Sequence, residues 1–307
     1  MSKNTIALLI SLLVAFLIGI LSIQIFGEYG WTVFCMVPLI IGFLPAFIIG
    51  KGKTITKKDA FKISFLVFLC VIVLLLAMAL EGLICIIMAL PFAIPLVFLG
   101  SYLGYISTQS DKINNSNVLL VFLIASIGSM SFDIINEPKE LIPVTTTIIV
   151  NAPIDSVWNN VVTFDKIGEP TDWLFSTGIA YPTEATIKGK GVGAIRYCNF
   201  TTGSFVEPIT IWNEPTLLKF DVIDQPAPMS EFNPFWDIHP KHLDGYFMSQ
   251  RGEFKLRKID KYKTELKGTT WYKVDITPEW YWAKWSDFII HRIHLRVLNH
   301  IKTESEK

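Results

Sequence analysis

The chain lacks net charge, has few cysteines and contains no recognised metal-binding motif. Its 307 residues include 27 basic and 27 acidic ones, and no basic stripe with interleaved aromatic residues occurs in its second half, so no nucleic-acid partner is predicted. Of the four cysteines, only Cys198 lies after position 136, which excludes a disulfide bond within that half. Neither an HExxH motif nor paired CxxC motifs are present, so the spacing indicates no closed metal site.

Apolar side chains, in contrast, are abundant. They make up 51% of the residues, and the mean hydropathy is +0.44, which is too apolar for an ordinary soluble protein. They are concentrated before position 136, whereas all five histidines lie after it. We therefore predict a transmembrane region over residues 1–136, a linker over 137–143 and a folded domain over 144–307.

Five segments of the first region are apolar enough to be predicted as transmembrane helices. Each needs about 20 residues, because the hydrocarbon core is about 30 Å thick and a helix rises about 1.5 Å per residue. The segments are residues 6–26, 31–49, 63–80, 83–106 and 118–135. The first is interpreted as a retained anchor, since no A-x-A cleavage motif follows it. The fifth is the weakest, because three serines and Asp133 dilute it.

The distribution of lysines predicts how these helices are oriented. Residues 51–62 carry five lysines, whereas residues 27–30 carry none, which places the lysine-rich loop in the cytoplasm. Five spans then leave the C-terminal domain outside, whereas a fifth segment that only skims the surface leaves it inside. We favour five spans, and predict an integral protein of the plasma (inner) membrane with an extracytoplasmic C-terminal domain. Its partners are the lipid bilayer and, in addition, an unidentified membrane protein.

After position 143 the pattern changes to short strands. VTTTIIV at 144–150 predicts a strand, and NAPIDSVWNNVVTF, which follows it directly, predicts a short helix with Pro153 in its first turn. Further strands are predicted at 193–200, 205–212, 217–223, 248–259 and 264–276, in an antiparallel meander. A long helix closes the chain, with Thr277 as its N-cap and Pro278 at its first position, and continues to about Lys302. Its apolar stripe consists of Trp282, Trp285, Ile289, Ile293, Val297 and Ile301.

This order of elements, together with IIVNAPIDSVWNNV, resembles the START-like helix-grip superfamily called SRPBCC and its polyketide cyclase and dehydrase branch. The strings TGIAYP, GVGAIRYCNFTTG, HPKHLDGY, GTTWY and WSDFIIHRIHLRVL look most like a membrane-anchored subgroup of it. The resemblance implies an α+β helix-grip domain, in which an antiparallel sheet curves around the C-terminal helix and encloses an apolar cavity. It fixes neither the ligand nor any catalytic residue.

The predicted ligand contacts are polar and aromatic residues of this domain. They are Arg196, Glu207, Trp236, Tyr246, Trp271 and Trp285. Arg196 and Glu207 lie on strands where an inward charge is buried and needs a partner, so they either contact the ligand or form an internal ion pair. Trp271 and Trp285 are of a kind that more often packs in the core than lines a pocket. Trp236 belongs to an irregular insertion at 225–245, which is expected either to cover the cavity entrance or to dip into the bilayer.

The same insertion supplies the candidates for chemistry. His239 or His242, oriented by Asp237 or Asp244, is suited to acid–base catalysis because histidine titrates near neutral pH. A metal site is the weaker alternative, with His239, His242, His291 and His294 as candidate ligands. His291 and His294 are three residues apart on the predicted helix, off its apolar stripe but near enough to reach one ion. We predict neither a metal nor a cofactor.

Two main functions follow from these features. In the first, the membrane-anchored protein binds a hydrophobic small molecule or a lipid in the cavity of its C-terminal domain. The lack of a recognised nucleophile, metal or cofactor motif favours this binding protein. In the second, it is a tethered cyclase/dehydrase-like or hydrolase-like enzyme with His239 or His242 as acid–base. A third hypothesis is that the helical bundle is the functional part and that the domain senses a ligand for it.

Overall fold

The computed structural model describes residues 2–25, 29–109, 115–134 and 140–307, and these form two compact units. The first unit contains residues 1–138 together with Glu231–Pro240 and Ile276–Pro278. The second contains Lys139–Ser230, Lys241–Asp275 and Glu279–Lys307. The predicted boundary at residue 136, the first three residues of the predicted linker and the ends of the predicted segments at residues 26 and 135 lie outside the described residues.

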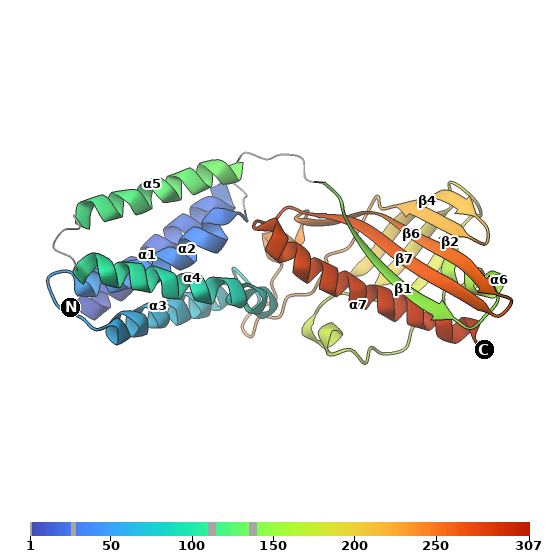
Figure 1. Ribbon diagram of the computed structural model, residues 1–307, viewed down its shortest axis with the longest axis horizontal. Coiled ribbons are helices and arrows are strands. Elements are labelled where there is room, and N and C mark those ends of the chain that lie inside the picture. Colours follow the sequence, from blue (N-terminus) through green and yellow to red (C-terminus); the bar gives the residue numbers. More distant parts are fainter. Residues whose placement is uncertain (1, 26–28, 110–114, 135–139) are drawn as a thin grey trace. The chain divides into compact units, whose positions relative to one another are not determined.

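The first unit consists of helices (Figure 1). They are α1 (Lys3–Ile20), α2 (Val37–Gly50), α3 (Lys57–Ala77), α4 (Leu83–Gln109) and α5 (Asn115–Ile134), with the π-helices η1 (Leu21–Ile25) and η2 (Thr32–Met36). Four helical stretches, Lys3–Ile23, Thr32–Gly50, Lys57–Ala77 and Leu83–Gln109, are long and apolar enough to cross a membrane. The predicted fifth segment corresponds to α5, whose strongly apolar part is the shorter stretch Leu119–Asp133.

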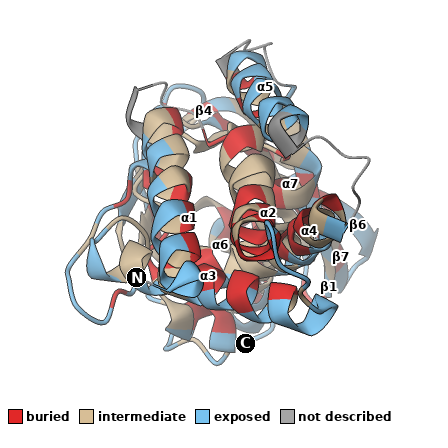
Figure 2. Cartoon of the chain, turned by 90° about the vertical axis from the view of Figure 1, so that its left-hand side faces the viewer, coloured by how far each residue is buried: buried red, intermediate tan, exposed pale blue. Residues whose placement is uncertain are grey.

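Helix α2 is the central helix of this unit. Most of its residues are buried, whereas α1 exposes one face (Figure 2). The exposed face of α1 carries Leu9, Leu13 and Leu17 at intervals of four residues. An apolar stripe on the outside of a helical bundle is the reverse of the pattern in a soluble bundle and is typical of helices in lipid.

Helix α5 runs along α2 in the opposite direction. The ring of Phe122 stacks on that of Phe43 with a centroid distance of 4.0 Å. Near the end of α5, the backbone N–H groups of Trp31 and Thr32 donate to the carboxylate of Asp133 at 2.8 and 2.9 Å. Asp133 therefore caps the first turn of another helix, where N–H groups lack intrahelical acceptors. This contact spans a hundred residues, and so the sequence pattern alone did not indicate it.

The second unit is a seven-stranded antiparallel sheet that curves around a long helix (Figure 1). The strands are β1 (Ile142–Val150), β2 (Pro182–Lys188), β3 (Ile195–Phe200), β4 (Gly203–Asn213), β5 (Leu217–Asp221), β6 (Phe247–Asp260) and β7 (Lys263–Val274). They are arranged in the order β1-β7-β6-β5-β4-β3-β2. The helices are α6 (Ile154–Val162), η3 (Trp173–Thr177), η4 (Lys241–Leu243) and α7 (Glu279–Ser305).

The predicted fold class, a helical bundle followed by a helix-grip domain, is confirmed. The prediction omitted β2, because its sequence PTEATIK contains only one large aliphatic residue and so shows no clear alternation. Helix α7 begins at Glu279, two residues after the predicted cap Thr277. The backbone N–H of Thr277 instead donates to the carbonyl of Tyr29, within the first unit.

The core of the second unit lies where α6 and the C-terminal half of α7 meet the sheet. Trp158, Leu266, Leu298 and Ile301 are buried almost completely. The indole of Trp158 meets that of Trp212 edge to face, with a centroid distance of 5.7 Å. Each such side chain stabilises the fold by roughly 1.5–3 kcal/mol through burial. This core covers the C-terminal half of α7. Residues nearer the middle of the helix, such as Ile289 and Ile293, line a cavity instead.

Candidate functional site

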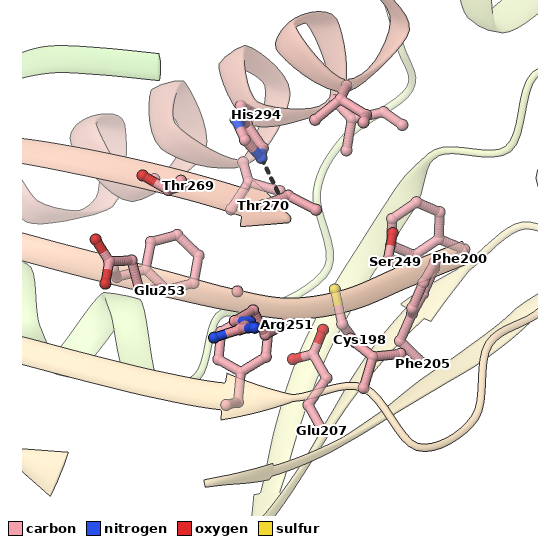
Figure 3. A pocket seen from close by; sticks show the side chains of 18 of the residues that line it. Cys198, Phe200, Phe205, Glu207, Ser249, Arg251, Glu253, Thr269, Thr270 and His294 are labelled. Atoms are coloured by element: carbon pink, nitrogen blue, oxygen red, sulfur yellow. Dashed lines mark hydrogen bonds between the residues drawn. The ribbon is translucent and has the colours of Figure 1, made fainter. Parts of the chain in front are cut away.

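A cavity of about 140 Å³ lies between the sheet and α7. Its apolar lining includes Phe200, Phe205, Phe220, Phe247, Phe254, Ile289, Ile290, Ile293, Val297 and Leu298. Figure 3 shows Glu207 and Cys198, from β4 and β3, across the cavity from His294 of α7. The volume is near that of an engineered cavity that holds benzene, about 150 Å³, and is below the roughly 300–1,000 Å³ usual for drug-sized ligands. The cavity therefore fits a small apolar molecule.

A buried ion pair forms part of the cavity wall. Arg196 and Glu207 are direct partners across β3 and β4, and they are only 1% and 5% exposed. The Nη1 atom of Arg196 donates to Oε2 of Glu207, and its Nε donates to the carbonyl of Val162 at 3.3 Å. Both side chains line the cavity, so they form an internal pair at a place where a ligand can reach them.

Aromatic rings surround the guanidinium of Arg196. The centroids of Phe164, Phe220 and Phe254 lie 5.5 to 5.6 Å from its Cζ atom, a distance at which a cation is attracted to the ring faces. Burial raises the pKa of Glu207, and the adjacent Arg196 opposes this effect. Because arginine stays protonated in proteins, the cavity contains a permanent cation with its carboxylate partner.

The thiol of Cys198 lines the cavity beside this pair but is not suited to nucleophilic chemistry. Burial, followed by the negative charge of Glu207, raises its pKa to about 12. Nucleophilic cysteines react as thiolates and have a lowered pKa. Cys198 therefore contributes a small, weakly polar surface to the cavity.

His294 also lines the cavity, although the predicted apolar stripe of the helix excluded it. Its Nε2 lies 2.8 Å from Oγ1 of Thr270, and its Nδ1 lies 3.1 Å from Oγ1 of Thr146. Nδ1 of His291 lies 2.8 Å from the same Thr146 oxygen. Since both ring nitrogens of His294 form hydrogen bonds, a metal ion would have to displace a threonine to bind there. The polar partners on β1 and β7 explain why a histidine is tolerated on this face.

Burial, followed by the charge of His291, lowers the pKa of His294 from 6.5 to about 4. The unfolded state therefore takes up the proton first, so the stabilisation is complete above pH 6.5 and is lost as the pH falls towards 4. We expect the β1–α7 contact to lose roughly 2–3 kcal/mol between pH 7 and pH 4.5. Hydrogen exchange of β1 and α7 amides, corrected for the intrinsic rate, measures this loss.

The variant His294→Asn is the control, since asparagine keeps a polar side chain but does not titrate. Its exchange protection should depend much less on pH over the same range. An unchanged pH dependence in this variant would mean that another group is responsible.

The remaining predicted ligand contacts lie outside the cavity lining. Among the described residues, Trp271, Trp285 and Tyr246 do not line it. The ring of Trp271 instead packs beneath two cations, with Arg251 and Lys219 each 5.9 Å from its centroid. Arg251 itself lines the cavity and is exposed, so it marks the place where the cavity reaches the surface.

The insertion at 225–245 is divided between the two units. Ala227 and Pro228 line the cavity, whereas Glu231–Pro240, which include Trp236, Asp237 and His239, belong to the first unit. Only the first part of the insertion therefore borders the cavity, and none of the predicted acid–base residues lies in the lining that the structure describes.

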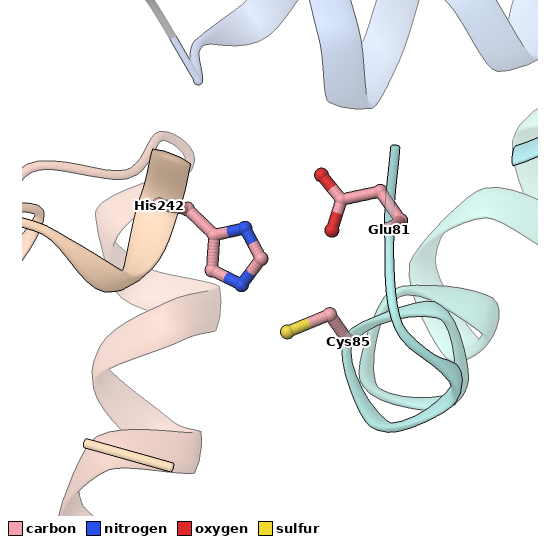
Figure 4. Close-up of side chains that lie close together, drawn as sticks. All are labelled: Glu81, Cys85 and His242. Atoms are coloured by element: carbon pink, nitrogen blue, oxygen red, sulfur yellow. The ribbon is translucent and has the colours of Figure 1, made fainter. Parts of the chain in front are cut away.

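His242 lies in η4 of the second unit, whereas Glu81 and Cys85 lie just before and within the first turn of α4 in the first unit (Figure 4). Because they belong to different units, no metal site is assigned to these three side chains. Their residue types, a histidine, a carboxylate and a thiol, are those that bind zinc in other proteins.

Several lining residues were missed from the sequence, although alternation along the strands contains the information. Arg196, Cys198 and Phe200 follow one another at every second position of β3, and Phe205 and Glu207 do so on β4. Side chains at every second position of a strand share a face. Once Arg196 is known to point into the cavity, Cys198 and Phe200 are expected to point into it as well.

Neither a family model nor a curated protein sequence matches the chain. Among solved structures, truncated norcoclaurine synthase from Thalictrum flavum is similar over 55% of this chain and 96% of its own, with 16% identity and a TM-score of 0.35. The Zhui aromatase/cyclase from Streptomyces sp. R1128 is similar over 54% and 94%, with 14% identity and a TM-score of 0.35. A protein from Nitrosospira multiformis is similar over 53% and 96%, with 16% identity and a TM-score of 0.35. These likenesses assign no activity and no residue role to this chain.

Proposed function

We propose that this protein is a membrane-anchored binding protein whose C-terminal domain holds a small hydrophobic molecule. The observation that carries the proposal is the cavity between the sheet and α7, which is lined mainly by phenylalanine and aliphatic side chains. Cavities of this kind, apolar with a few fixed polar groups, are the usual form of small-molecule sites.

The polar groups of the cavity define the class of ligand. The pair of Arg196 and Glu207 offers a cation and a carboxylate inside an apolar wall, and exposed Arg251 offers a second cation at the surface. A ligand with an aromatic or aliphatic body and one polar or acidic end satisfies this arrangement.

The contacts of the first unit support an extracytoplasmic location for this domain. Lys3 donates to the carbonyl of Lys51 at 2.9 Å, so the N-terminus lies at the lysine-rich end of α2, the end expected in the cytoplasm. Asp133, near the end of α5, binds instead to Trp31 and Thr32, which precede α2. With 20 residues, α5 is about 30 Å long, enough to return the chain to the outer side before β1.

Filling the cavity tests the proposal. Val222 lines the cavity, whereas the neighbouring Ile223 is 68% exposed and lies outside the lining. We expect Val222→Trp to weaken the binding of small aromatic probes at least about tenfold, because the indole occupies their volume. Ile223→Trp is the matched control and should bind like the wild-type chain.

The measurement is calorimetric titration of phenol, indole and 1-naphthol into the full chain in lipid nanodiscs, with the heat of empty nanodiscs subtracted. Circular dichroism establishes that both variants are folded. Equal affinity of the two variants, or no heat above that of empty nanodiscs for any probe, would contradict the proposal.

A further inference from the structure

Residues 231–240, which follow the cavity-lining loop in the sequence, cover the turn between α3 and α4 within the first unit. The side-chain amide of Asn233 donates to the carbonyls of Leu76 and Glu81 at 2.9 and 3.2 Å. The backbone N–H of Leu83 donates to the carbonyl of Phe232 at 2.8 Å. Carbonyl groups at the end of a helix lack intrahelical donors, and this segment supplies side-chain donors to the end of α3.

Two polar residues of the segment point inward, whereas its three aromatic residues are exposed, as are Asp237 and His239. Glu231 and Asn233 are buried, and a side chain added at Gly82 would collide with the carboxylate of Glu231. Phe232, Phe235 and Trp236 are 57%, 61% and 55% exposed. An outward aromatic cluster of this size is unusual on a surface that faces only water.

The end of α3 fixes the depth of this cluster. The apolar part of α3 begins at Ile63, after the lysine-rich first turns, and the helix ends at Ala77. The predicted span 63–80 is about 27 Å long, so this end of α3 lies near the far edge of the hydrocarbon core. The indole Nε1 of Trp236 donates to the carbonyl of Ala77 at 2.9 Å. Trp236 is thus held where the hydrocarbon core meets the headgroups, which is the depth at which tryptophan is enriched in membrane proteins.

We propose that residues 231–240 form an interfacial segment that inserts Phe232, Phe235 and Trp236 into the headgroup and upper acyl region of the bilayer. Lipid is the occupant because the cluster binds to the end of α3, where Val73 and, directly after the helix, Met78 are also exposed apolar residues. The segment therefore attaches the C-terminal domain, in whose sequence it lies, to the surface of the bilayer. This role is independent of any ligand in the cavity.

The depth of position 235 tests the proposal. A nitroxide is attached at Phe235→Cys in the full chain after Cys35, Cys70, Cys85 and Cys198 are replaced by alanine. The protein is reconstituted into vesicles of phosphatidylcholine and phosphatidylglycerol, and collisions with oxygen and with a water-soluble nickel complex are measured by electron paramagnetic resonance.

Two matched labels calibrate the result. Leu69→Cys lies in the middle of α3, and Ile223→Cys lies on the second unit; both wild-type side chains are exposed. We expect the ratio of oxygen to nickel collisions at position 235 to be severalfold above that at 223 and below that at 69. A ratio equal to that at 223 would overturn the proposal.

A second measurement does not depend on the cysteine-free background. The difference in fluorescence between the wild-type chain and Trp236→Phe isolates the emission of Trp236. This emission should be quenched by lipids brominated near the headgroup and protected from aqueous iodide. Quenching by iodide without quenching by brominated lipid would also overturn the proposal.

Discussion

Replacing Glu207 by alanine is expected to lower the free energy of unfolding of the second unit by about 3–5 kcal/mol. The substitution leaves the guanidinium of Arg196 buried without its carboxylate, because both side chains are almost fully inaccessible. The three rings around Arg196 replace only part of that interaction. The loss is measured by hydrogen exchange of the amides of β3 and β4 in the full chain.

Removing both charges should restore most of this stability. In the double variant Arg196→Met/Glu207→Leu no unpaired charge remains, and buried pairs replaced by apolar residues often give an equally stable fold. Glu253→Ala is the control, since the pair of Glu253 with Lys219 is partly exposed and is worth about 1 kcal/mol or less. A double variant as unstable as Glu207→Ala would mean that the pair contributes through its shape or hydrogen bonds rather than its charge balance.

Replacing Gly100 by leucine should prevent normal packing of the first unit. Helices α2 and α4 approach closely at Gly42, Gly100 and Gly104, as small residues allow in membrane bundles. A side chain at position 100 would collide with the backbone carbonyl of Leu39, which cannot rotate away. We expect a loss of about 3 kcal/mol or more.

The matched control is Gly19→Leu, because the space around a side chain at position 19 of α1 is open. That change should alter the stability by less than about 0.5 kcal/mol. The midpoint of thermal aggregation in detergent, followed by size-exclusion chromatography, compares the two variants. Equal midpoints would contradict the close approach of α2 and α4.

Periodicity in the sequence predicted the elements of the fold, whereas contacts between distant residues determined the details of the site. The spacing of apolar residues was enough for α6 and α7, because one face of each helix is buried in the sheet. The pairing of Arg196 with Glu207 was one of two open alternatives, since alternation gives two faces but does not say which is inside.

Other features depended on partners that no local pattern reveals. His294 is accommodated on the cavity side of α7 because Thr146 and Thr270 reach it from β1 and β7. Asp133 is accommodated in an apolar helix because it caps another one. Composition indicates either a lid or a membrane contact for the insertion at 225–245, whereas the hydrogen bonds of Asn233 and Trp236 to the carbonyls of Leu76 and Ala77 follow from no local pattern.

The end of α3 is capped by residues that the ribosome adds long after it has completed the helix, and this sets an order of events during translation. Asn233 and Trp236 follow the carbonyls that they bind by 157 and 159 residues. A ribosome that adds about 5–20 residues per second reaches them roughly 8–30 s after it has finished α3. During that interval water or lipid headgroups have to take the place of these two donors at the carbonyls of Leu76 and Ala77. The bundle therefore reaches its final form only after more than half of the C-terminal domain has been synthesised.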